Sequence, residues 1–356
     1  MKISKKQRRL LRFAIITALV MVARPLHDSG RTQSESMVDM FHFSGKTLVC
    51  GIDLGDDMRG GHGLETGFAY EVMKDFARDH NCSIQIVTAG KGADYADSLR
   101  SGVIDFLIMH HEEADADMIL SDNIIDCSAL AMSQGKEGHI REINEWISEY
   151  TQSEKFNQNK ALFFRTFNPI KRAENGIVTQ TVSPYDSLFR HYAKELGWDW
   201  RMLAAVVYQE SKFSISSRSH RGASGLMQVM PQTGAVYDVD DLIDPEQNLK
   251  AGTSHLKRLQ RLYCSCDMSD EERIRFTLAA YNAGEGRIMD CRNLARAKRL
   301  NENVWSNIVD VIPMMREDLI LTDENVKLGK FKGVETITYV DNIMELYDAI
   351  CQICPR

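Results

Sequence analysis

The 356-residue sequence predicts an α+β protein with two folded domains, an α/β domain followed by an all-helical domain. Residues 47–165 alternate short apolar runs with helix-like patterns, which is typical of a sheet layered with helices. Residues 183–356 instead carry apolar side chains at three- to four-residue spacing, which predicts helices. The polar segment between them, residues 166–182, contains Pro169 and Gly176 and is the predicted linker.

Composition excludes some classes of protein. The chain is 44% hydrophobic and 26% charged, which is sufficient for two cores, and its net charge is −7. No basic block lies within the folded segments, which argues against a nucleic-acid partner. Three of the eight cysteines fall in the first domain and five in the second, so a full set of disulfides within each domain is not expected. Cys351-x-x-Cys354 lacks the context of a redox or zinc motif, and we predict no metal and no cofactor.

The first 24 residues have the pattern of an export signal. Six basic residues precede an apolar run from Phe13 to Ala23, whose length suits a signal peptide and is short for a membrane span. Met21 is large for a cleavage site, so two alternatives stay open, a removed signal peptide or an uncleaved membrane anchor. Residues 25–46 are a predicted linker. The expected location is therefore periplasmic, with membrane attachment if residues 1–24 are retained.

Strands and helices of the first domain can be placed by periodicity. Expected strands cover residues 48–54, 83–88, 104–109 and 124–132, and expected helices cover 65–80, 94–100 and 140–150. Two candidate sites in this domain match no functional motif. The glycines of residues 55–63 lack the Gly-Lys-Ser/Thr of a phosphate loop, so we predict a flexible turn. His110-His111-Glu112-Glu113 lacks the spacing of a helical zinc motif, so we predict a solvated loop.

The second domain is expected to consist of helices with readable ends. Ser183 and Pro184 are the predicted cap and first residue of one helix, which Gly197 ends. The next helix follows Asp199 and carries Glu210. Further helices are expected at 245–263, 270–281, 285–297 and 339–353.

Glu210 is the candidate catalytic residue of the second domain. It lies in line with the apolar stripe of Leu203, Val206 and Val207, and a carboxyl group held against apolar side chains is favoured in its protonated form. Such a group can act as a general acid near neutral pH. The alternative is a solvated residue at the end of the helix. A small-residue segment follows at 222–225, and residues 226–231 mix apolar side chains with one amide, as a wall for a sugar would.

Several ordered motifs resemble the soluble lytic transglycosylase (SLT) domain family. They are Glu210-Ser211, Ser219, Gly222-Ala223-Ser224-Gly225-Leu226-Met227-Gln228, Met230-Pro231 and Ala280-Tyr281-Asn282-Ala283-Gly284. The resemblance spans about residues 183–354 and is greatest to the membrane-bound lytic murein transglycosylase F type. It implies a lysozyme-like fold and a lyase that cleaves the β-1,4 bond between N-acetylmuramic acid and N-acetylglucosamine in peptidoglycan.

The resemblance also implies a role for each matching residue. Glu210 would protonate the leaving oxygen and then remove the proton of the sugar's own C6 hydroxyl, giving a 1,6-anhydro ring without water. The substrate-binding residues implied are Ser211, Ser219, Met227, Gln228, Tyr281, Asn282, Glu335 and Tyr339. By spacing alone, Met227 and Tyr281 would be interpreted as core residues. Arg221 stands where some members have a second serine.

The first domain resembles one lobe of the periplasmic solute-binding domains. The resemblance is carried by Val49-Cys50-Gly51-Ile52, Gly67-Phe68-Ala69-Tyr70-Glu71, residues 99–105 and Leu120-Ser121-Asp122. The second lobe is missing, and Asp115 and Asp117 replace the family's arginine. A muropeptide or protein partner is one interpretation of this domain, and a packing or targeting role is the other. For the whole chain, the alternatives are a lysozyme-type hydrolase and a catalytically silent peptidoglycan-binding sensor.

Overall fold

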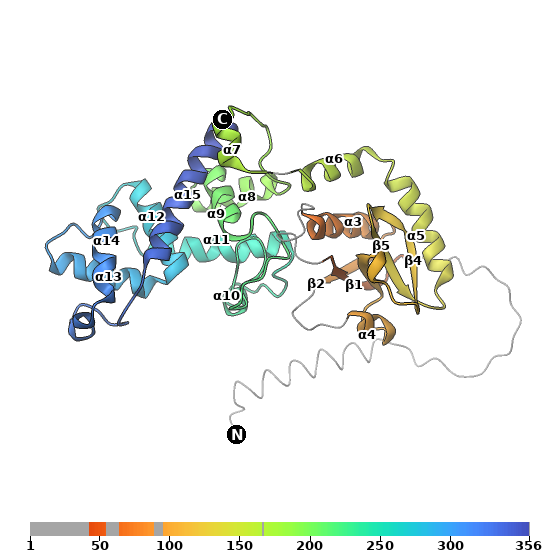
Figure 1. Ribbon diagram of the computed structural model, residues 1–356, viewed down its shortest axis with the longest axis horizontal. Helices are drawn as coiled ribbons and strands as arrows, with labels where there is room; N and C mark the ends of the chain where they lie inside the picture. The colour runs from red at the N-terminus through yellow and green to blue at the C-terminus, as the bar shows by residue number, and fades with distance from the viewer. Residues whose placement is uncertain (1–42, 55–63, 89–94, 166, 356) are drawn as a thin grey trace, which may run out of the picture. The chain divides into compact units, whose positions relative to one another are not determined.

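The computed structural model describes residues 43–54, 64–88, 95–165 and 167–355 (Figure 1). The predicted signal peptide or anchor, the linker up to residue 42 and the glycine-rich residues 55–63 lie outside these ranges. Residues from Phe41 to Arg356 form one compact unit. In the part of the chain that is described, none of the helices combines the length and apolar composition needed to cross a lipid bilayer.

A mixed five-stranded sheet forms the first part of the fold, with strand order β2-β1-β3-β5-β4. The strands are β1 (Thr47–Asp53), β2 (Ser83–Thr88), β3 (Phe106–His110), β4 (Met118–Ile125) and β5 (Ser128–Ser133). β1 pairs in parallel with β2 and β3, whereas β5 runs antiparallel to both β3 and β4. The parallel strands are joined through α3 (Glu65–Asp79) and α4 (Tyr95–Arg100), as a parallel sheet requires.

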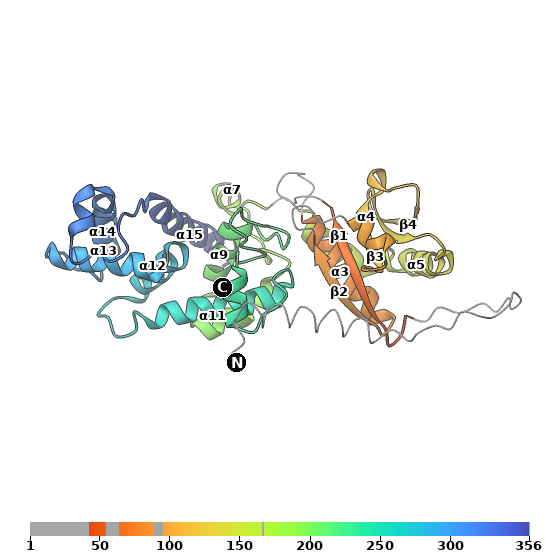
Figure 2. The same ribbon diagram turned by 90° about the horizontal axis from the view of Figure 1, so that it is seen from below.

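Helices cover both faces of this sheet (Figures 1 and 2). α3 and α5 (Glu137–Tyr150) pack on one face, where Phe68, Phe76 and Ile143 meet alternate strand residues such as Ile52 and Ile108. α4 covers the opposite face, where a smaller cluster forms around the remaining strand positions: Tyr95, Leu99, Ile104, Leu107, Met109 and Ala131. Because successive strand residues point to opposite faces, this division follows directly from the apolar runs of the sequence.

The structure corrects several predicted elements. The strand expected at 124–132 is a hairpin, since Asp126 has a φ of 43° and turns the chain between β4 and β5. α6 (Glu154–Phe163), capped by the Ser153 hydroxyl, had not been expected. The predicted linker contains α7 (Pro169–Glu174), which Asn168 caps. Asp115 and Asp117, noted as departures from the solute-binding pattern, both pair with Arg100 of α4.

The remaining residues form mainly helices, as the sequence predicts, but the helices at Pro231–Val236 and Trp305–Val311 were not expected. The helices are α8 (Asp186–Leu196), α9 (Trp200–Ser211), α10 (Pro231–Val236), α11 (Pro245–Arg261), α12 (Asp270–Ala283), α13 (Glu285–Ala297), α14 (Trp305–Val311) and α15 (Val334–Ile353), with short 3-10 helices at Ile312–Arg316 and Asp318–Thr322. α8 begins later than predicted. The carboxylate of Asp186 accepts hydrogen bonds from the amides of Val182 and Ser183, so Ser183 belongs to a buried turn rather than to the helix cap.

Two long helices, α15 and α11, bring together helices that are distant in the sequence. α15 packs against α9 and α7, although about 120 residues separate it from α9 in the sequence (Figure 1). α11 contacts α8 and α12. The sheet face under α3 and the helical core share one continuous cluster of buried side chains, linked through Phe163, Tyr185 and Phe189.

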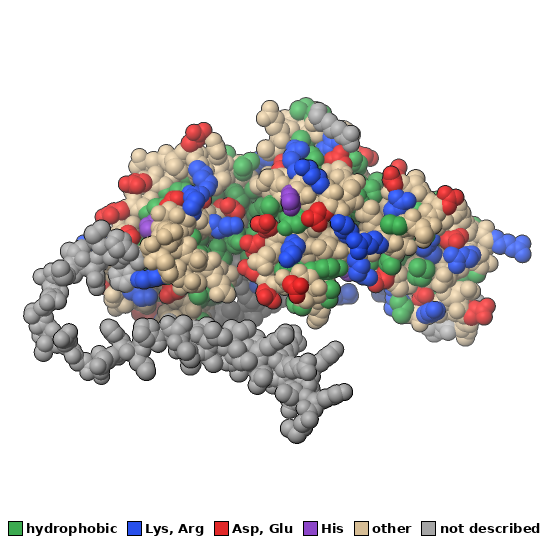
Figure 3. Space-filling model, turned by 180° about the vertical axis from the view of Figure 1, so that it is seen from behind, with side chains coloured by type: hydrophobic (Ala, Val, Ile, Leu, Met, Phe, Trp, Pro, Cys, Tyr) green, Lys and Arg blue, Asp and Glu red, His purple; other side chains and the backbone are tan. Residues whose placement is uncertain are grey.

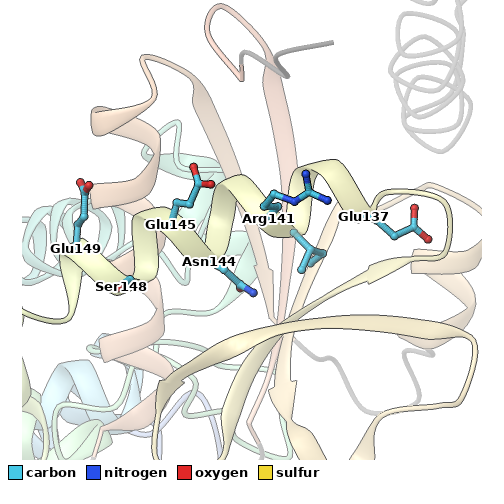
Figure 4. A pocket seen from close by; sticks show the side chains of 7 residues that line it. Glu137, Arg141, Asn144, Glu145, Ser148 and Glu149 are labelled. Carbon is cyan, nitrogen blue, oxygen red and sulfur yellow. The ribbon is translucent and has the colours of Figure 1, made fainter. Parts of the chain in front are cut away.

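On the face seen in Figure 3, acidic and basic side chains are intermixed, and neither forms a large patch. A shallow depression along α5 is lined by residues of that helix, which are polar except for Ile140 and include Glu137, Arg141 and Glu145 (Figure 4). Asn144 in this row accepts a hydrogen bond from the Asp122 amide and so ties α5 to β4. None of the predicted site residues lies in this depression.

Candidate active site

Glu210 lies in the last turn of α9, the most deeply buried helix of the second domain. Asp199 caps the helix, since its carboxylate accepts from the Arg201 amide. Leu203, Val206 and Val207 are fully buried, as their spacing predicts. Lys212 ends α9 in a left-handed conformation with a φ of 53°. The helix therefore carries Glu210 to the point where the buried stripe meets the surface, and its side chain is half-buried.

The environment of Glu210 shifts the carboxyl towards its protonated form. Burial raises the pKa of this carboxyl to about 7, because the charged form loses solvation. The hydroxyl of Tyr339 donates a hydrogen bond to Glu210 Oε1 at 2.5 Å, which acts in the opposite direction and lowers the pKa. Among the described residues, no second carboxylate contributes to the shift. The site therefore contains one protonatable acid held by one tyrosine.

Tyr281 of α12 lies beside this pair. Its hydroxyl donates to the carbonyl of Met227 at 2.8 Å, and the proximity of the Glu210 charge contributes to raising its pKa well above the usual value. Burial is the larger cause of that shift. The structure thus brings together Glu210 from α9, Tyr281 from α12 and Tyr339 from α15, three residues that lie far apart in the sequence.

A buried asparagine fixes the segment 224–228 next to the site. Asn248 of α11 is fully buried, and its Oδ1 accepts from the Met227 amide. Its Nδ2 donates to the carbonyls of Ser224 and Leu242. Gly225 has a φ of 75°, and a Cβ there would lie 2.2 Å from the Leu242 carbonyl, so this close approach requires glycine.

Met227 and Gln228 hold this segment in place. The Met227 side chain is fully buried and packs against Gly252 of α11, so it belongs to the core rather than facing a sugar ring. Gln228 adopts a φ of 48° and donates from Nε2 to the carbonyls of Ser217 and Gly225. Its amide nitrogen is committed to the protein, and only Oε1 is left for a substrate.

The two predicted serines also make internal hydrogen bonds. Ser211 is buried, and its hydroxyl donates to the carbonyl of Val207 one turn earlier in α9. Ser219 is exposed, and its hydroxyl accepts from the amide of Ala223. The Ser219 side chain therefore closes the turn that leads into the segment of Gly222 to Gly225.

Asn282 and Glu335 are exposed at the junction of α12 and α15. Asn282 Oδ1 accepts from the hydroxyl of buried Thr336 at 2.9 Å, which connects the end of α12 to the first turn of α15. Glu335 lies in that first turn, where its charge complements the helix dipole. α15 begins five residues earlier than predicted, so Glu335 and Tyr339 lie one turn apart on the same helix.

Sequence reasoning missed two groups at this site. Asn248 follows the same spacing as buried Gly252, Leu256 and Leu259, so an amide on an apolar stripe was the available signal. The other group is a row of rings that leads away from Tyr281. The centroid of His255 lies 5.6 Å from that of Tyr281, and the centroid of Tyr237 lies 6.3 Å from that of His255. Within the described residues, no group of three His, Cys, Asp or Glu side chains is arranged to hold a metal ion.

The fold and the site define a helical domain built around one protonatable glutamate. Residues 187–304 match the family described as "Transglycosylase SLT domain", which is about a third of the chain.

Sequence relatives are named as lytic transglycosylases. The chain is 31% identical over 230 residues to the membrane-bound lytic murein transglycosylase F of Desulfosudis oleivorans. This alignment covers 63% of this chain and 50% of the relative. It is 36% identical over 170 residues to the protein of that name from Shewanella frigidimarina, covering 48% and 34%. The chain thus spans half or less of the length of these relatives. It also resembles the solved 70 kDa soluble lytic transglycosylase of Escherichia coli, with a TM-score of 0.35 and 21% identity over 72% of this chain and 40% of that one.

Proposed function

We propose that this chain is a peptidoglycan lytic transglycosylase whose single catalytic acid is Glu210. The observation that carries the proposal is the half-buried carboxyl with a pKa of about 7, hydrogen-bonded to Tyr339. Such a group is protonated often enough at neutral pH to donate a proton and ionises readily enough to take one back. A reaction that needs both steps from one residue requires this intermediate pKa.

In the proposed reaction, Glu210 protonates the oxygen of the β-1,4 bond between N-acetylmuramic acid and N-acetylglucosamine. The bond to the anomeric carbon breaks, and the resulting carboxylate accepts the proton of the muramyl C6 hydroxyl. That oxygen closes on C1 and gives a 1,6-anhydro ring, so no water is consumed. Proton transfer of this kind contributes about 10²–10⁴-fold, and the intramolecular position of the hydroxyl supplies a further advantage.

The substrate contacts proposed for the neighbouring residues follow from the atoms they leave available. Gln228 Oε1 is free to accept from a sugar hydroxyl, because its Nε2 is bound to backbone carbonyls. Asn282 and Glu335 are exposed at the junction of α12 and α15 and offer an amide and a carboxylate. Ser211, Ser219 and Met227 act through the shape of the segment they hold, since their polar or apolar groups already have partners in the protein.

For the first part of the chain, we propose a single lobe of the solute-binding type that contacts a muropeptide or a protein. The parallel arrangement of β2, β1 and β3 with an antiparallel β5 supports an open sheet of this kind. The SLT match begins at residue 187, and 170 residues of the chain lie from there to residue 356. The match to the Desulfosudis relative extends over 230 residues, so part of it lies before residue 187. We propose a periplasmic location, attached to the membrane if the N-terminal segment is retained.

Product analysis on purified sacculi tests the function. We expect the parent to release 1,6-anhydromuramyl products, detected by mass spectrometry, and Glu210→Gln to lose at least about 10²-fold in rate. Glutamine is the suitable variant because its Oε1 can still accept from Tyr339, so the contact at 2.5 Å can be kept.

Each other outcome refutes a specific part of the proposal. Equal rates for the parent and Glu210→Gln would exclude Glu210 as the acid. Products with reducing ends would identify a lysozyme-type hydrolase. Binding of sacculi by the parent without any cleavage would identify a peptidoglycan-binding sensor.

A further inference from the structure

Cys127, His110 and Glu65 form a side-chain cluster in the α/β part of the chain, outside the site of Glu210. We infer that Cys127 is a reactive thiol, activated by His110, that undergoes exchange with small disulfides. The cluster combines a nucleophile, a base beside it and a carboxylate next to the base. That order of groups is the one by which proteins activate thiols and hydroxyls.

The nucleophile and the base are held at hydrogen-bond distance by the sheet. Cys127 Sγ lies 3.3 Å from Nδ1 of His110. His110 is the last residue of β3, and Cys127 directly precedes β5, whose first residue pairs with His110 in the antiparallel register. The amide of His111 donates to the Cys127 carbonyl at 2.7 Å, which extends the pairing by one residue. Both backbones are therefore fixed, and the contact does not depend on a free loop.

The carboxylate comes from a third element. Glu65 is the first residue of α3, and its side chain is only 9% exposed. Its Oε2 lies 3.9 Å from Nε2 of His110, on the side of the ring away from the sulfur. This carboxylate lies where it would attract the imidazolium formed when His110 takes the thiol proton.

Access distinguishes Cys127 from most of the other cysteines. Cys127 is exposed, whereas Cys50 and Cys291 are buried, and burial raises the pKa of the Cys291 thiol to about 12. Cys264 is also exposed, but its sulfur lies 3.6 Å from the carbonyl of Gln260, in the last turn of α11, which ends just before Cys264. Cys264 is therefore an internal control, a second exposed thiol that lies next to a backbone acceptor instead of an imidazole.

The position of the cluster in the sheet suits a small molecule. β1 continues through α3 to β2 on one side, and β3 lies on its other side, so the connections diverge between β1 and β3. In open sheets, ligands bind outside the carboxyl ends of the strands at such a point. Glu65 follows β1 and His110 ends β3, which places the cluster at this edge.

The proposed step is thiol–disulfide exchange. His110 Nδ1 accepts the proton of the Cys127 thiol as the sulfur attacks one sulfur of a low-molecular-weight disulfide. The new bond is a mixed disulfide on Cys127, the disulfide bond of the reagent breaks, and its second sulfur leaves as a thiolate that takes up the proton. No electrons are gained or lost overall, and the co-reactant is the disulfide itself.

The test uses the full chain with oxidised glutathione as the probe, and mass spectrometry of peptides follows each cysteine separately. At pH 6.5, where an unassisted thiol is mostly protonated, we expect Cys127 to react at least about tenfold faster than Cys264. His110→Ala is expected to remove this advantage at pH 6.5 and to matter much less at pH 8.5, where thiols ionise without help. Glu65→Gln is expected to give a partial loss at pH 6.5. Among the described residues, the ionisable groups next to His110 and Cys127 along the chain are His111, Glu112, Glu113 and Asp126.

Two results would overturn the inference. One is equal rates for Cys127 and Cys264 at pH 6.5, and the other is an unchanged Cys127 rate in His110→Ala. His110→Asn serves as a second variant if His110→Ala does not fold, since an amide keeps polarity but accepts no proton, and it should show the same loss. Cleavage of sacculi by each variant reports that the rest of the chain is intact, because the cluster is separate from Glu210.

Discussion

Glu210 is subject to two opposing influences, and their balance sets the pH range in which it can work. Burial at the end of α9 raises the pKa of the carboxyl, and the hydrogen bond from Tyr339 lowers it. Neither influence alone would leave the value near 7. A fully buried acid without a donor would ionise too late to act as a base, and a solvated one would ionise too early to act as an acid.

The first prediction concerns Tyr339. Tyr339→Phe removes the hydroxyl that donates to Glu210, so the carboxylate loses its stabilising hydrogen bond and the pKa of Glu210 should rise. The descending limb of kcat/KM against pH, where the general acid becomes deprotonated, should move upward by about 0.5–1 pH unit. The measurement is the pH profile of soluble glycan release from sacculi.

Tyr281→Phe is the matched control for Tyr339→Phe. It also removes a buried tyrosine hydroxyl, but that hydroxyl donates to the Met227 carbonyl and not to Glu210. The limb should stay in place while stability falls by about 1 kcal/mol. A shift in Tyr281→Phe as large as that in Tyr339→Phe would contradict the role given to the Tyr339 hydroxyl.

The second prediction is that Glu210 destabilises the protein at alkaline pH. Its folded pKa of about 7 exceeds the ordinary value of 4.5, so the folded state binds the extra proton and stability falls as pH rises between these values. Below pH 4.5 the acid is neutral in both states and no difference remains. Glu210→Gln does not titrate and should be more stable than the parent by about 2–3 kcal/mol at pH 8 and equal to it near pH 4. Urea unfolding at the two pH values measures this, and an equal gain at both would exclude an ionisation effect.

At the level of elements, the segment 224–228 depends on a backbone approach that a side chain would block. The third prediction compares Gly225→Ala with Gly222→Ala. Both glycines have positive φ, 75° and 88°, so both variants carry the same conformational strain of about 1 kcal/mol. Only at Gly225 would the new Cβ meet the Leu242 carbonyl and the Asn248 amide, whereas nothing lies within 4 Å at Gly222.

We therefore expect Gly225→Ala to lose about 3 kcal/mol or more and Gly222→Ala about 1 kcal/mol. Thermal unfolding gives the difference, and sacculus digestion shows whether the displaced segment also lowers activity. Equal losses in the two variants would mean that strain alone explains the need for glycine, and that the contact with α11 is unimportant.

The elements also show what periodicity can and cannot predict. α9 was predicted correctly because its stripe is unbroken and Asp199 caps it. α15 was predicted to start at Tyr339 because the residues before it are mixed in polarity, yet the helix begins at Val334. Met227 was assigned to the substrate from its place in a motif, although its side chain fills the space over Gly252. A motif identifies which residues matter, but it does not show whether side chain or backbone is used.

For the whole molecule, the sequence predicted an α/β part followed by a helical part, but it did not predict the contacts between distant segments. Each strand or helix can be predicted from the periodicity of a short stretch of sequence. The hydrogen bond between Glu210 and Tyr339, in contrast, joins residues 129 positions apart. Such contacts depend on how α9 and α15 pack, and no window of the sequence contains both. The SLT resemblance implied that both residues belong to one site, and the structure shows the hydrogen bond between them.

The fourth prediction concerns a contact between the sheet part and the helical part. The Tyr70 hydroxyl of α3 donates to Oδ2 of Asp244 at 2.5 Å, and Oδ1 of Asp244 accepts from the Gln247 amide to cap α11. The same carboxylate thus caps a helix and binds a residue 174 positions away. In a double-mutant cycle of Tyr70→Phe and Asp244→Asn, we expect a coupling energy of about 1–3 kcal/mol in urea unfolding of the full chain, because the acceptor is a carboxylate oxygen and the hydrogen bond is partly buried.

The same cycle tells whether the continuous buried cluster makes the two parts unfold together. If they do, both single variants lower one common transition, since the contact is lost when either part opens. If the parts unfold independently, two transitions appear, and Tyr70→Phe leaves the more stable one unchanged. Asparagine caps a helix as well as aspartate does, so Asp244→Asn keeps the cap of α11 through its Oδ1 and replaces the carboxylate oxygen that accepts from the Tyr70 hydroxyl. The variant therefore tests the contact with Tyr70 rather than the cap.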